Sequence, residues 1–428
     1  MTGSTRKAFV ALLTGVSVLL VAAGCSSSNS GGGGNNSSSS PAAAGGGSAS
    51  GPLKTVTIGV LQDTTGPAAS GNKTAVDGVK AGVVYGQRNG YKIKYVVGDT
   101  ATNPATALAA AQKFVTQDHV DAVIAHSAIT FAAAPYLTAH KVPVIGAAED
   151  GPEWITAPNM FGVFGAIHTT KVADTTGKLF KLLGVSTVGA LGYSISPSSS
   201  EAAKAAIASA KSQGLKEGYL NASFPFGSTN VQPVALAMKK NNVDGFTAAT
   251  DPNTAFALIT ALRNTGANVK AALLATGYGG DVLQAGPGAL AAAQNVYFTV
   301  GYEPMEMQTA ATKQFDADLK SAGVHGVPTY AMYNGYASVG LLVRALKENG
   351  GNTDQPAIIA GLQKIHDWNA LGLWGTHTLD INDRENIVGG ADNCTWATKL
   401  VGDKFELVQG ADPICGKVLE GVTVSPSS

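Results

Sequence analysis

The sequence TVTIGVL, at residues 55–61, is a short run of apolar and β-branched residues of the kind that forms a buried strand. Three further runs of this kind follow it: KIKYVV at 92–97, VDAVIA at 120–125 and VPVIGA at 142–147. Three helical stretches separate these runs. The first covers about 73–87, the second begins with Asn103 as N-cap and Pro104 at the first helical position, and the third lies around 132–140. Strands that alternate with helices of this length predict βαβ units and a parallel sheet.

The same alternation restarts after Thr169. Strands are expected at 186–191, 217–220, 243–249 and 269–276, and helices at about 172–183, 198–213, 231–240 and from Pro252. Two consecutive blocks of similar size predict an α/β protein with two doubly wound, Rossmann-like lobes and a ligand cleft at the carboxyl ends of the strands. Residues 302–349 indicate long helices, with Pro328 at a helix start, and the tail from Asn369 indicates short strands and turns.

The amino terminus predicts export. Arg6 and Lys7 precede an apolar run at 8–23, and the small residues that follow end at Cys25. This is the arrangement of a secretory signal rather than of a membrane span. A Cys directly after small residues matches the bacterial lipobox, although Ala22 stands where Leu is usual. We therefore expect residues 1–24 to be a lipoprotein signal peptide and Cys25 to be acylated, with plain secretion or an uncleaved anchor as the alternatives.

Residues 25–52 form the expected tether between the acylated Cys and the folded body. The segment 26–51 consists almost entirely of Gly, Ser, Asn and Ala. As a flexible coil it would span about 30 Å, from about 5–6 Å times the square root of its length. The sequence thus predicts an extracytoplasmic protein anchored to the bacterial cell membrane by lipid.

Composition excludes some classes of partner. The chain has 29 basic and 29 acidic residues, and without residues 1–24 the balance is 27 basic against 29 acidic, a net charge of −2. Nothing in this balance indicates nucleic acid, which calls for a basic face. Charged residues make up only 14% of the chain, so we expect a weakly charged monomer that binds a small molecule. The roughly 375 residues from 53 onward suit two lobes.

Two cysteines remain beyond Cys25. An exported chain meets an oxidising environment, in which Cys394 and Cys415 are expected to form a disulfide. The bridge would close a loop of 20 residues and stabilise the fold by about 3 kcal/mol. The competing interpretation is a metal site with His366 or His377 upstream, but it lacks further ligands at metal-binding spacing. We expect neither a metal nor a cofactor.

The order of several segments resembles the branched-chain amino-acid-binding family of type I periplasmic-type solute-binding proteins. The segments are IGVLQDTTGPAAS, GDTATNPATALAAAQKFVTQDHVDAVIAHSAIT, VPVIGAA, VDGFTAATDPNTAFALITALRNTG and YNGYASVGLLVRALKENGG, and the match covers 53 to about 385. The resemblance implies a type I periplasmic-binding-protein fold with a three-crossing hinge. It places 53–168 and 301–374 in lobe one, and 169–300 and 375–428 in lobe two. It further implies a small polar ligand, such as an amino acid or an amide, delivered to the permease of an ABC transporter.

Ligand contacts of lobe one follow from the same resemblance. Ser127 matches the serine that binds the ligand carboxylate in the family, although its position before a helix is also that of an N-cap. Ala148 matches a backbone contact, and Asp150 falls where the amino-acid binders have Thr. Two carboxylates within about 4 Å would repel by several kcal/mol, so Asp150 favours an amine, an amide or another donor, unless it only starts a turn. Trp154 could wall the cleft or pack inside the lobe.

Contacts from lobe two are less specific. The loop ATGYGGD, 275–281, has Gly277 and Tyr278 where the amino-acid binders carry a Glu for the ligand ammonium. Tyr278 is expected either to touch the ligand or to pack at the loop base. The remaining candidates follow predicted strands: Tyr193, Ser196, Thr250 and Asp251.

No catalytic motif is present. The segment GPAASGNKT, 66–74, departs from a P-loop because Asn72 separates the Gly from the Lys. There is no G-x-S-x-G and no H-E-x-x-H. We expect a binding protein rather than an enzyme. The alternatives are a ligand sensor of the same fold that signals through a membrane receptor, and a purely structural lipoprotein.

Overall fold

The computed structural model describes residues 52–147, 151–284 and 286–425, and these belong to one compact unit. The predicted signal peptide, Cys25 and the tether therefore lie outside the described residues, as do Ala148 and Asp150. No helix within the described ranges has the length and apolar content of a membrane span.

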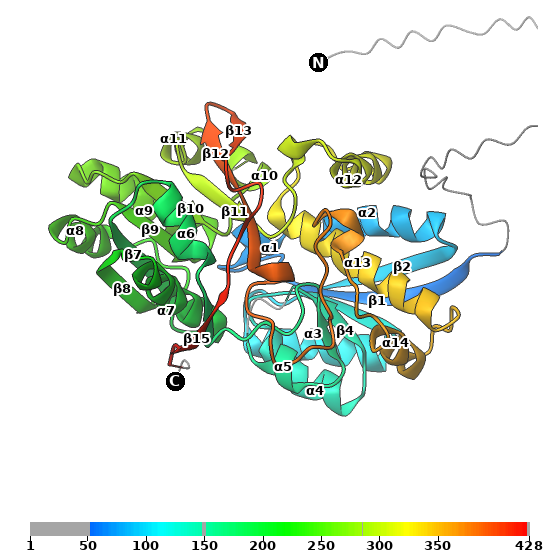
Figure 1. Ribbon diagram of the computed structural model, residues 1–428. Helices are drawn as coiled ribbons and strands as arrows, with labels where there is room; N and C mark the ends of the chain where they lie inside the picture. Colours follow the sequence, from blue (N-terminus) through cyan, green and yellow to red (C-terminus); the bar gives the residue numbers. More distant parts are fainter. Residues whose placement is uncertain (1–51, 148–150, 285, 426–428) are drawn as a thin grey trace, which may run out of the picture. The chain divides into compact units, whose positions relative to one another are not determined.

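The first lobe is built on a five-stranded parallel sheet, shown in blue and cyan in Figure 1. In spatial order its strands are β2 (Tyr91–Asp99), β1 (Lys54–Gln62), β3 (Ala122–His126), β4 (Val144–Gly146) and β5 (Met160–Gly162). Its helices include α1 (Ala69–Asn72), α2 (Ala75–Arg88), α3 (Pro104–Thr116), α4 (Ala134–Ala139) and α5 (Glu153–Thr156). Strand β3 is buried along its whole length, as its apolar run predicts. The Asn103 side chain caps α3 by accepting from the amides of Ala105 and Thr106, which confirms the predicted helix start.

A later part of the chain returns to this lobe. Its helices are α12 (Ala310–Ser321), α13 (Tyr330–Glu348) and α14 (Gln355–Leu362). Helix α13 packs along α2, and Figure 1 shows the two side by side in yellow and blue. Glycines allow this close approach, because a Cβ added at Gly78 would lie 1.9 Å from the Met332 carbonyl oxygen. Helix α13 is therefore part of the core of the first lobe, although it lies far along the sequence.

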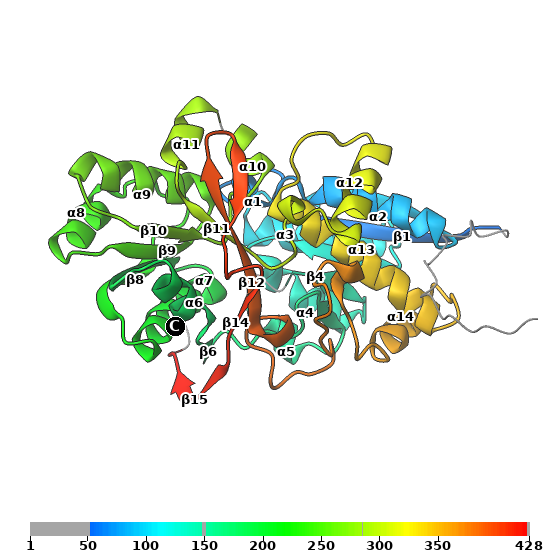
Figure 2. The ribbon, with the colours of Figure 1, turned by 45° about the horizontal axis from the view of Figure 1, so that its top comes forward.

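The second lobe has a seven-strand path, β13-β12-β11-β10-β9-β7-β8. Its parallel strands are β7 (Thr187–Tyr193), β8 (Lys216–Phe224), β9 (Gly245–Ala249), β10 (Ala271–Leu274) and β11 (Tyr297–Val300). Two antiparallel strands from the tail, β12 (Cys394–Val401) and β13 (Lys404–Leu407), extend it beside β11, as both ribbon views show (Figure 1, Figure 2). Its helices include α6 (Thr175–Leu182), α7 (Pro197–Ser212), α8 (Gln232–Lys240), α9 (Pro252–Thr265), α10 (Gly280–Gln284) and α11 (Pro287–Ala292).

Short strands complete the second lobe. Strand β14 (Ile414–Cys415) pairs with β12, and β15 (Val418–Thr423) pairs with β6 (Lys171–Ala173). The chain thus passes between the lobes three times: between β5 and β6, after β11, and before β12. This arrangement confirms the predicted α/β fold with two doubly wound lobes. The lobe boundaries predicted at 168/169, 300/301 and 374/375 fall within these crossings, although their positions stay a prediction.

Candidate functional site

A cavity of about 450 Å³ lies between the strand-end loops of the two sheets. The first lobe contributes Ala128 after β3 and Ala147 after β4, and the second contributes Tyr193 at the end of β7 and Thr250 after β9. Ligands of open α/β sheets bind outside the carboxyl ends of the strands, and small-molecule sites occupy about 300–1,000 Å³. This inter-lobe cavity therefore has the position and the size of a small-molecule site.

Six aromatic residues lie in the walls of the inter-lobe cavity. They are Phe164, Tyr193, Phe226, Tyr330, Trp374 and Trp396. The ring of Phe164 lies 5.8 Å from that of Trp374 and 6.4 Å from that of Tyr330. In the second lobe, Tyr193 meets Phe226 edge to face at 4.7 Å. The two lobes thus each present an aromatic surface to a ligand.

Three polar atoms in the cavity wall have no hydrogen-bond partner among the described residues. They are Oγ1 of Thr250, Oδ2 of Asp281 and Nε1 of Trp396, and each atom is buried. Burial raises the pKa of the Asp281 carboxyl to about 8, although nearby Lys73 acts to lower it. A buried polar group without a partner is costly, so these atoms mark where a ligand would gain hydrogen bonds.

Asp251 also lies in the wall, but its oxygens are already occupied. It caps α9 by accepting from the amides of Asn253 (2.9 Å) and Thr254 (3.1 Å). The Tyr193 hydroxyl donates to its Oδ2, and the pKa of Tyr193 is raised by burial and by this neighbouring carboxylate. The Ser70 hydroxyl reaches Asp251 from the first lobe at 3.3 Å. Asp251 therefore joins the two lobes and holds Tyr193 in place.

Ser127 is not among the residues that line the cavity. Its hydroxyl donates to Oδ1 of Asp63 at 2.8 Å, and both residues are fully buried. The Thr100 hydroxyl donates to the same oxygen, while Asn72 Nδ2 (2.8 Å) and the Ala128 amide (2.9 Å) donate to Oδ2. Four donors thus converge on Asp63. The Ser127 hydroxyl was expected to bind a ligand carboxylate, but it is hydrogen-bonded to the carboxylate of Asp63 instead.

Of the other residues predicted as ligand contacts, some line the cavity and others lie in the hydrophobic core. Ser196 lines the inter-lobe cavity and caps α7 by accepting from the Ser199 amide at 3.3 Å. Tyr278 lies in the core, where its hydroxyl donates to Glu306 at 2.7 Å and its ring meets Phe405 edge to face. Burial raises the pKa of Tyr278 well above its usual value. Trp154 is buried inside the first lobe. Tyr278 and Trp154 thus occupy the packing positions that were the alternatives to ligand contact.

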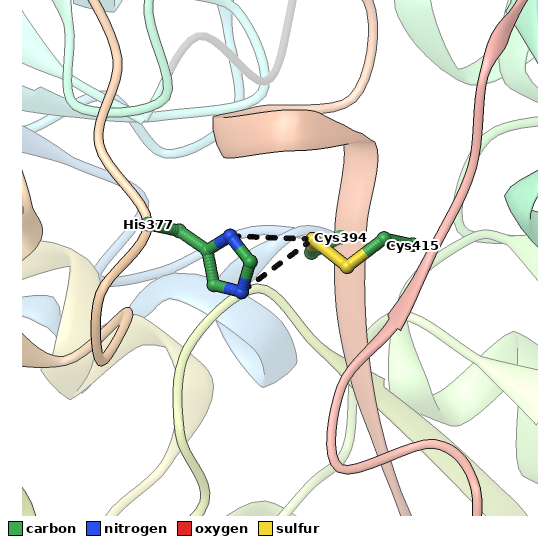
Figure 3. A group of neighbouring side chains, drawn as sticks. All are labelled: His377, Cys394 and Cys415. Atoms are coloured by element: carbon green, nitrogen blue, oxygen red, sulfur yellow. Dashed lines mark hydrogen bonds between the residues drawn. A yellow bond between two sulfur atoms is a disulfide. The ribbon is translucent and has the colours of Figure 1, made fainter.

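The predicted disulfide between Cys394 and Cys415 is present, and it joins β12 to β14. His377 lies against it, with Nδ1 3.8 Å from the Cys394 sulfur (Figure 3). Nδ1 is also 2.8 Å from Oδ2 of Asp392. Because the two sulfurs are bonded to each other, they are not available as thiolate ligands, and the group has no geometry for a metal while the bridge is intact.

Sequence reasoning missed Asp63 and Asp281. Asp281 closes the ATGYGGD segment, in which a Glu three or four positions earlier was sought as the ammonium ligand. A carboxylate anywhere in that loop, just after a predicted strand, would have been the signal. Asp63 follows the first strand with no local mark of its role, because its donors lie 9 to 65 residues away.

Comparison with known proteins gives one family and many related folds. A family model described as periplasmic binding protein matches residues 55–403. No curated protein sequence is significantly similar to this chain.

Solved structures with the same fold share little sequence with it. An ABC-transporter solute-binding protein from R. palustris, in complex with 4-hydroxybenzoate, is 18% identical with a TM-score of 0.65, over 88% of this chain and 98% of that one. A leucine-binding protein from Thermotoga maritima is 18% identical with a TM-score of 0.67, over 82% and 97%. A possible leucine/isoleucine/valine-binding protein from Rhodopirellula baltica is 15% identical with a TM-score of 0.68, over 84% and 98%. At these identities the likeness concerns the fold alone.

Proposed function

Because the chain belongs to the periplasmic binding protein family, we propose that it is an extracytoplasmic lipoprotein that captures a small molecule in the inter-lobe cavity and delivers it to an ABC importer. Membership confirms the family read from the sequence. Proteins of this family bind solutes and are not enzymes, and the family implies an extracytoplasmic location. Beyond family membership, this proposal adds the capture of a particular ligand, the lipid anchor and the importer.

The observation that carries the proposal is the inter-lobe cavity, which is lined by loops of both lobes. A ligand held from two sides binds the state in which the lobes lie together better than a state in which they are apart. Only such differential affinity shifts a conformational equilibrium. A membrane partner that recognises the ligand-bound arrangement could then take up the solute without any reaction.

Two further observations support the details. The lipobox at Cys25 and the Gly/Ser tether behind it are the arrangement expected of a binding protein that stays close to a membrane importer. Structures of the same fold are described with a leucine-binding role and with bound 4-hydroxybenzoate. Ligands of that size fit a cavity of about 450 Å³.

Thermal denaturation with a ligand panel tests capture. The panel comprises amino acids, amides, ureas, polyamines, aromatic acids and aromatic amines. A ligand at 100 times its dissociation constant adds about 2.7 kcal/mol to the free energy of unfolding, which raises Tm measurably. The control variant is Ala202→Trp, because Ala202 lies exposed on α7 at the cavity wall, and a large ring there would block the space without disturbing the core.

The outcomes separate capture from delivery. We expect at least one panel member to stabilise the wild type and not Ala202→Trp. Absence of any stabilisation across the panel contradicts capture. For delivery, uptake of the identified ligand is measured in cells that lack this protein and in cells that carry Cys25→Ala. We expect loss of uptake in the first and release of the protein from membranes in the second. Unchanged uptake without the protein would contradict import.

A further inference from the structure

We infer that the inter-lobe cavity selects an organic cation, a protonated amine carried on an aromatic or comparably apolar body, over amino acids and other carboxylates. This inference rests on the proposed function, because it takes the inter-lobe cavity to be a ligand site. It deepens that function by naming the class of solute. Three independent features of the cavity support it.

The first feature is the aromatic wall. Six aromatic side chains face the inter-lobe cavity from both lobes, and two of them are the indoles of Trp374 and Trp396. Aromatic faces attract cations through the ring quadrupole, by about 0.5–2 kcal/mol per contact, and most strongly at Trp. The same rings bury the apolar body of a ligand. An aromatic surface on each side of the cavity therefore suits an apolar cation better than a polar zwitterion.

The second feature is the charge of the wall. No Lys, Arg or His is present among the described residues that line the cavity, whereas Asp251 and Asp281 both lie there. Asp251 already accepts hydrogen bonds from Tyr193, Ser70 and two helix amides. Oδ2 of Asp281 is buried with no partner within the described residues. An ammonium group at Asp281 would supply the missing donor, and its charge would add to that of nearby Lys73 in favouring the ionised carboxylate, which burial disfavours.

Thr250 lies in the wall of the same cavity. Its hydroxyl oxygen is also buried in the wall without a partner among the described residues, and it follows β9 next to the strand that leads to Asp281. A primary ammonium carries three donors. It can therefore donate to Oδ2 of Asp281 or to the Thr250 hydroxyl, whereas a carboxylate can only accept, from the Thr250 hydroxyl or from Nε1 of Trp396.

The third feature is that hydrogen-bond donors which an anionic ligand would need already bind a carboxylate of the chain. The Ser127 hydroxyl, which was expected to bind a ligand carboxylate, and the neighbouring Ala128 amide both donate to Asp63. A ligand carboxylate would have to displace a buried carboxylate from four donors, or sit beside it without them. Either arrangement costs several kcal/mol. Asp63 thus takes, from within the chain, the Ser127 hydroxyl donor that was expected to bind the ligand's anion.

Calorimetry with three probes tests the inference. The probes are 2-phenylethylamine, 3-phenylpropionate and leucine, which are a cation, an anion with the same aromatic body, and a zwitterion. We expect 2-phenylethylamine to bind at least tenfold more tightly than either of the others. Asp281→Asn keeps the shape of the side chain and should weaken amine binding at least tenfold. Asp403→Asn makes the same substitution at an exposed site outside the cavity and should leave the affinity unchanged.

Each outcome is decisive. Tighter binding of 3-phenylpropionate or leucine overturns the cationic class but leaves capture in the cavity intact. Equal affinities of the Asp281→Asn and Asp403→Asn variants for the amine overturn the role of Asp281. Failure of all three probes overturns the inference, while the wider ligand panel still decides capture. The comparison among probes uses wild-type protein, so it stands even if a variant fails to fold.

Discussion

Asp281 is the residue whose burial has the clearest consequence for stability. Its carboxyl has a pKa of about 8 in the folded protein, against an ordinary value of 3.8, because burial disfavours the charged form. Between pH 4 and 8 the native state keeps a proton that the unfolded chain has released. Stability therefore falls as pH rises through this window. Lys73 opposes the effect but does not cancel it.

We expect Asp281→Asn to remove this dependence, since an amide does not titrate. The gain in Tm of the variant over the wild type should be small at pH 4 and increase steadily up to pH 8. Calorimetric Tm values at pH 4, 5, 6, 7 and 8 measure it, with Asp403→Asn as the exposed control. A difference that does not change with pH would show that the Asp281 carboxyl is not held neutral by the fold.

The hydrogen bonds to Asp63 lead to a second prediction, on the free energy of unfolding. Asp63→Ala would leave the donors of Ser127, Thr100, Asn72 and Ala128 without their acceptor, at about 1–3 kcal/mol for each buried group. We expect a loss of about 3 kcal/mol or more in the free energy of unfolding. Ser127→Ala removes one donor and should cost about 1–2 kcal/mol.

Urea denaturation and ligand titration together decide the role of Ser127. If Ser127 only binds ligand, its replacement by Ala will lower affinity and leave stability unchanged. If it serves Asp63, as the 2.8 Å hydrogen bond indicates, stability will fall and the affinity for an amine ligand will change little.

At the scale of elements, the disulfide fastens the tail to the second sheet. Cys394 begins β12 and Cys415 ends β14, and the bridge closes a loop across 21 positions. In the chain-entropy description such a loop stabilises by about 3 kcal/mol. We expect the double variant Cys394→Ser, Cys415→Ser to have a Tm several degrees lower than the wild type.

A thiol reductant provides the internal control for this comparison. It should lower the Tm of the wild type toward that of the double variant and leave the double variant unchanged. Scanning calorimetry with and without the reductant measures both effects. Equal Tm values for the oxidised wild type and the double variant would mean that β12 and β14 are held together without the bridge.

At the scale of the whole molecule, loops of the two lobes touch beside the cavity. A Cβ added at Gly227, in the second lobe, would lie 2.7 Å from Cβ of Pro67 in the first, which is closer than such atoms approach. Gly227→Ala should therefore push the lobes apart. We expect a larger radius of gyration in small-angle scattering and weaker ligand binding, by tenfold for each 1.4 kcal/mol that the contact costs.

Gly214→Ala is the matched control for this prediction. Gly214 and Gly227 both have positive φ, at +80° and +67°, so Ala is strained at either position, but nothing lies within 4 Å of a Cβ at Gly214. Gly214→Ala should lose stability without a change in radius. If both variants scatter like the wild type, the contact at Pro67 does not govern how the lobes meet.

The sequence alone determined those features whose physical cause is local. Alternating apolar strands and helices predicted two doubly wound lobes, and Asn103 before Pro104 predicted the start of α3. Both are confirmed, because hydrophobic period and capping depend on residues within one or two turns. The pairing of Cys394 with Cys415 followed from their number and from export. Strands β5 and β11, of three and four residues, were not predicted.

The chemistry of the cavity was decided only by the tertiary structure. Ser127 reads equally as a ligand contact or a cap until Asp63, 64 residues earlier, is placed beside it. Tyr278 is a loop residue in the sequence, yet it lies in the core because Glu306 and Phe405 cover it. Asp281 is an ordinary acid until burial leaves its Oδ2 without a partner. Hydrogen bonding and desolvation depend on which distant residues surround a group, and folding alone brings those residues together.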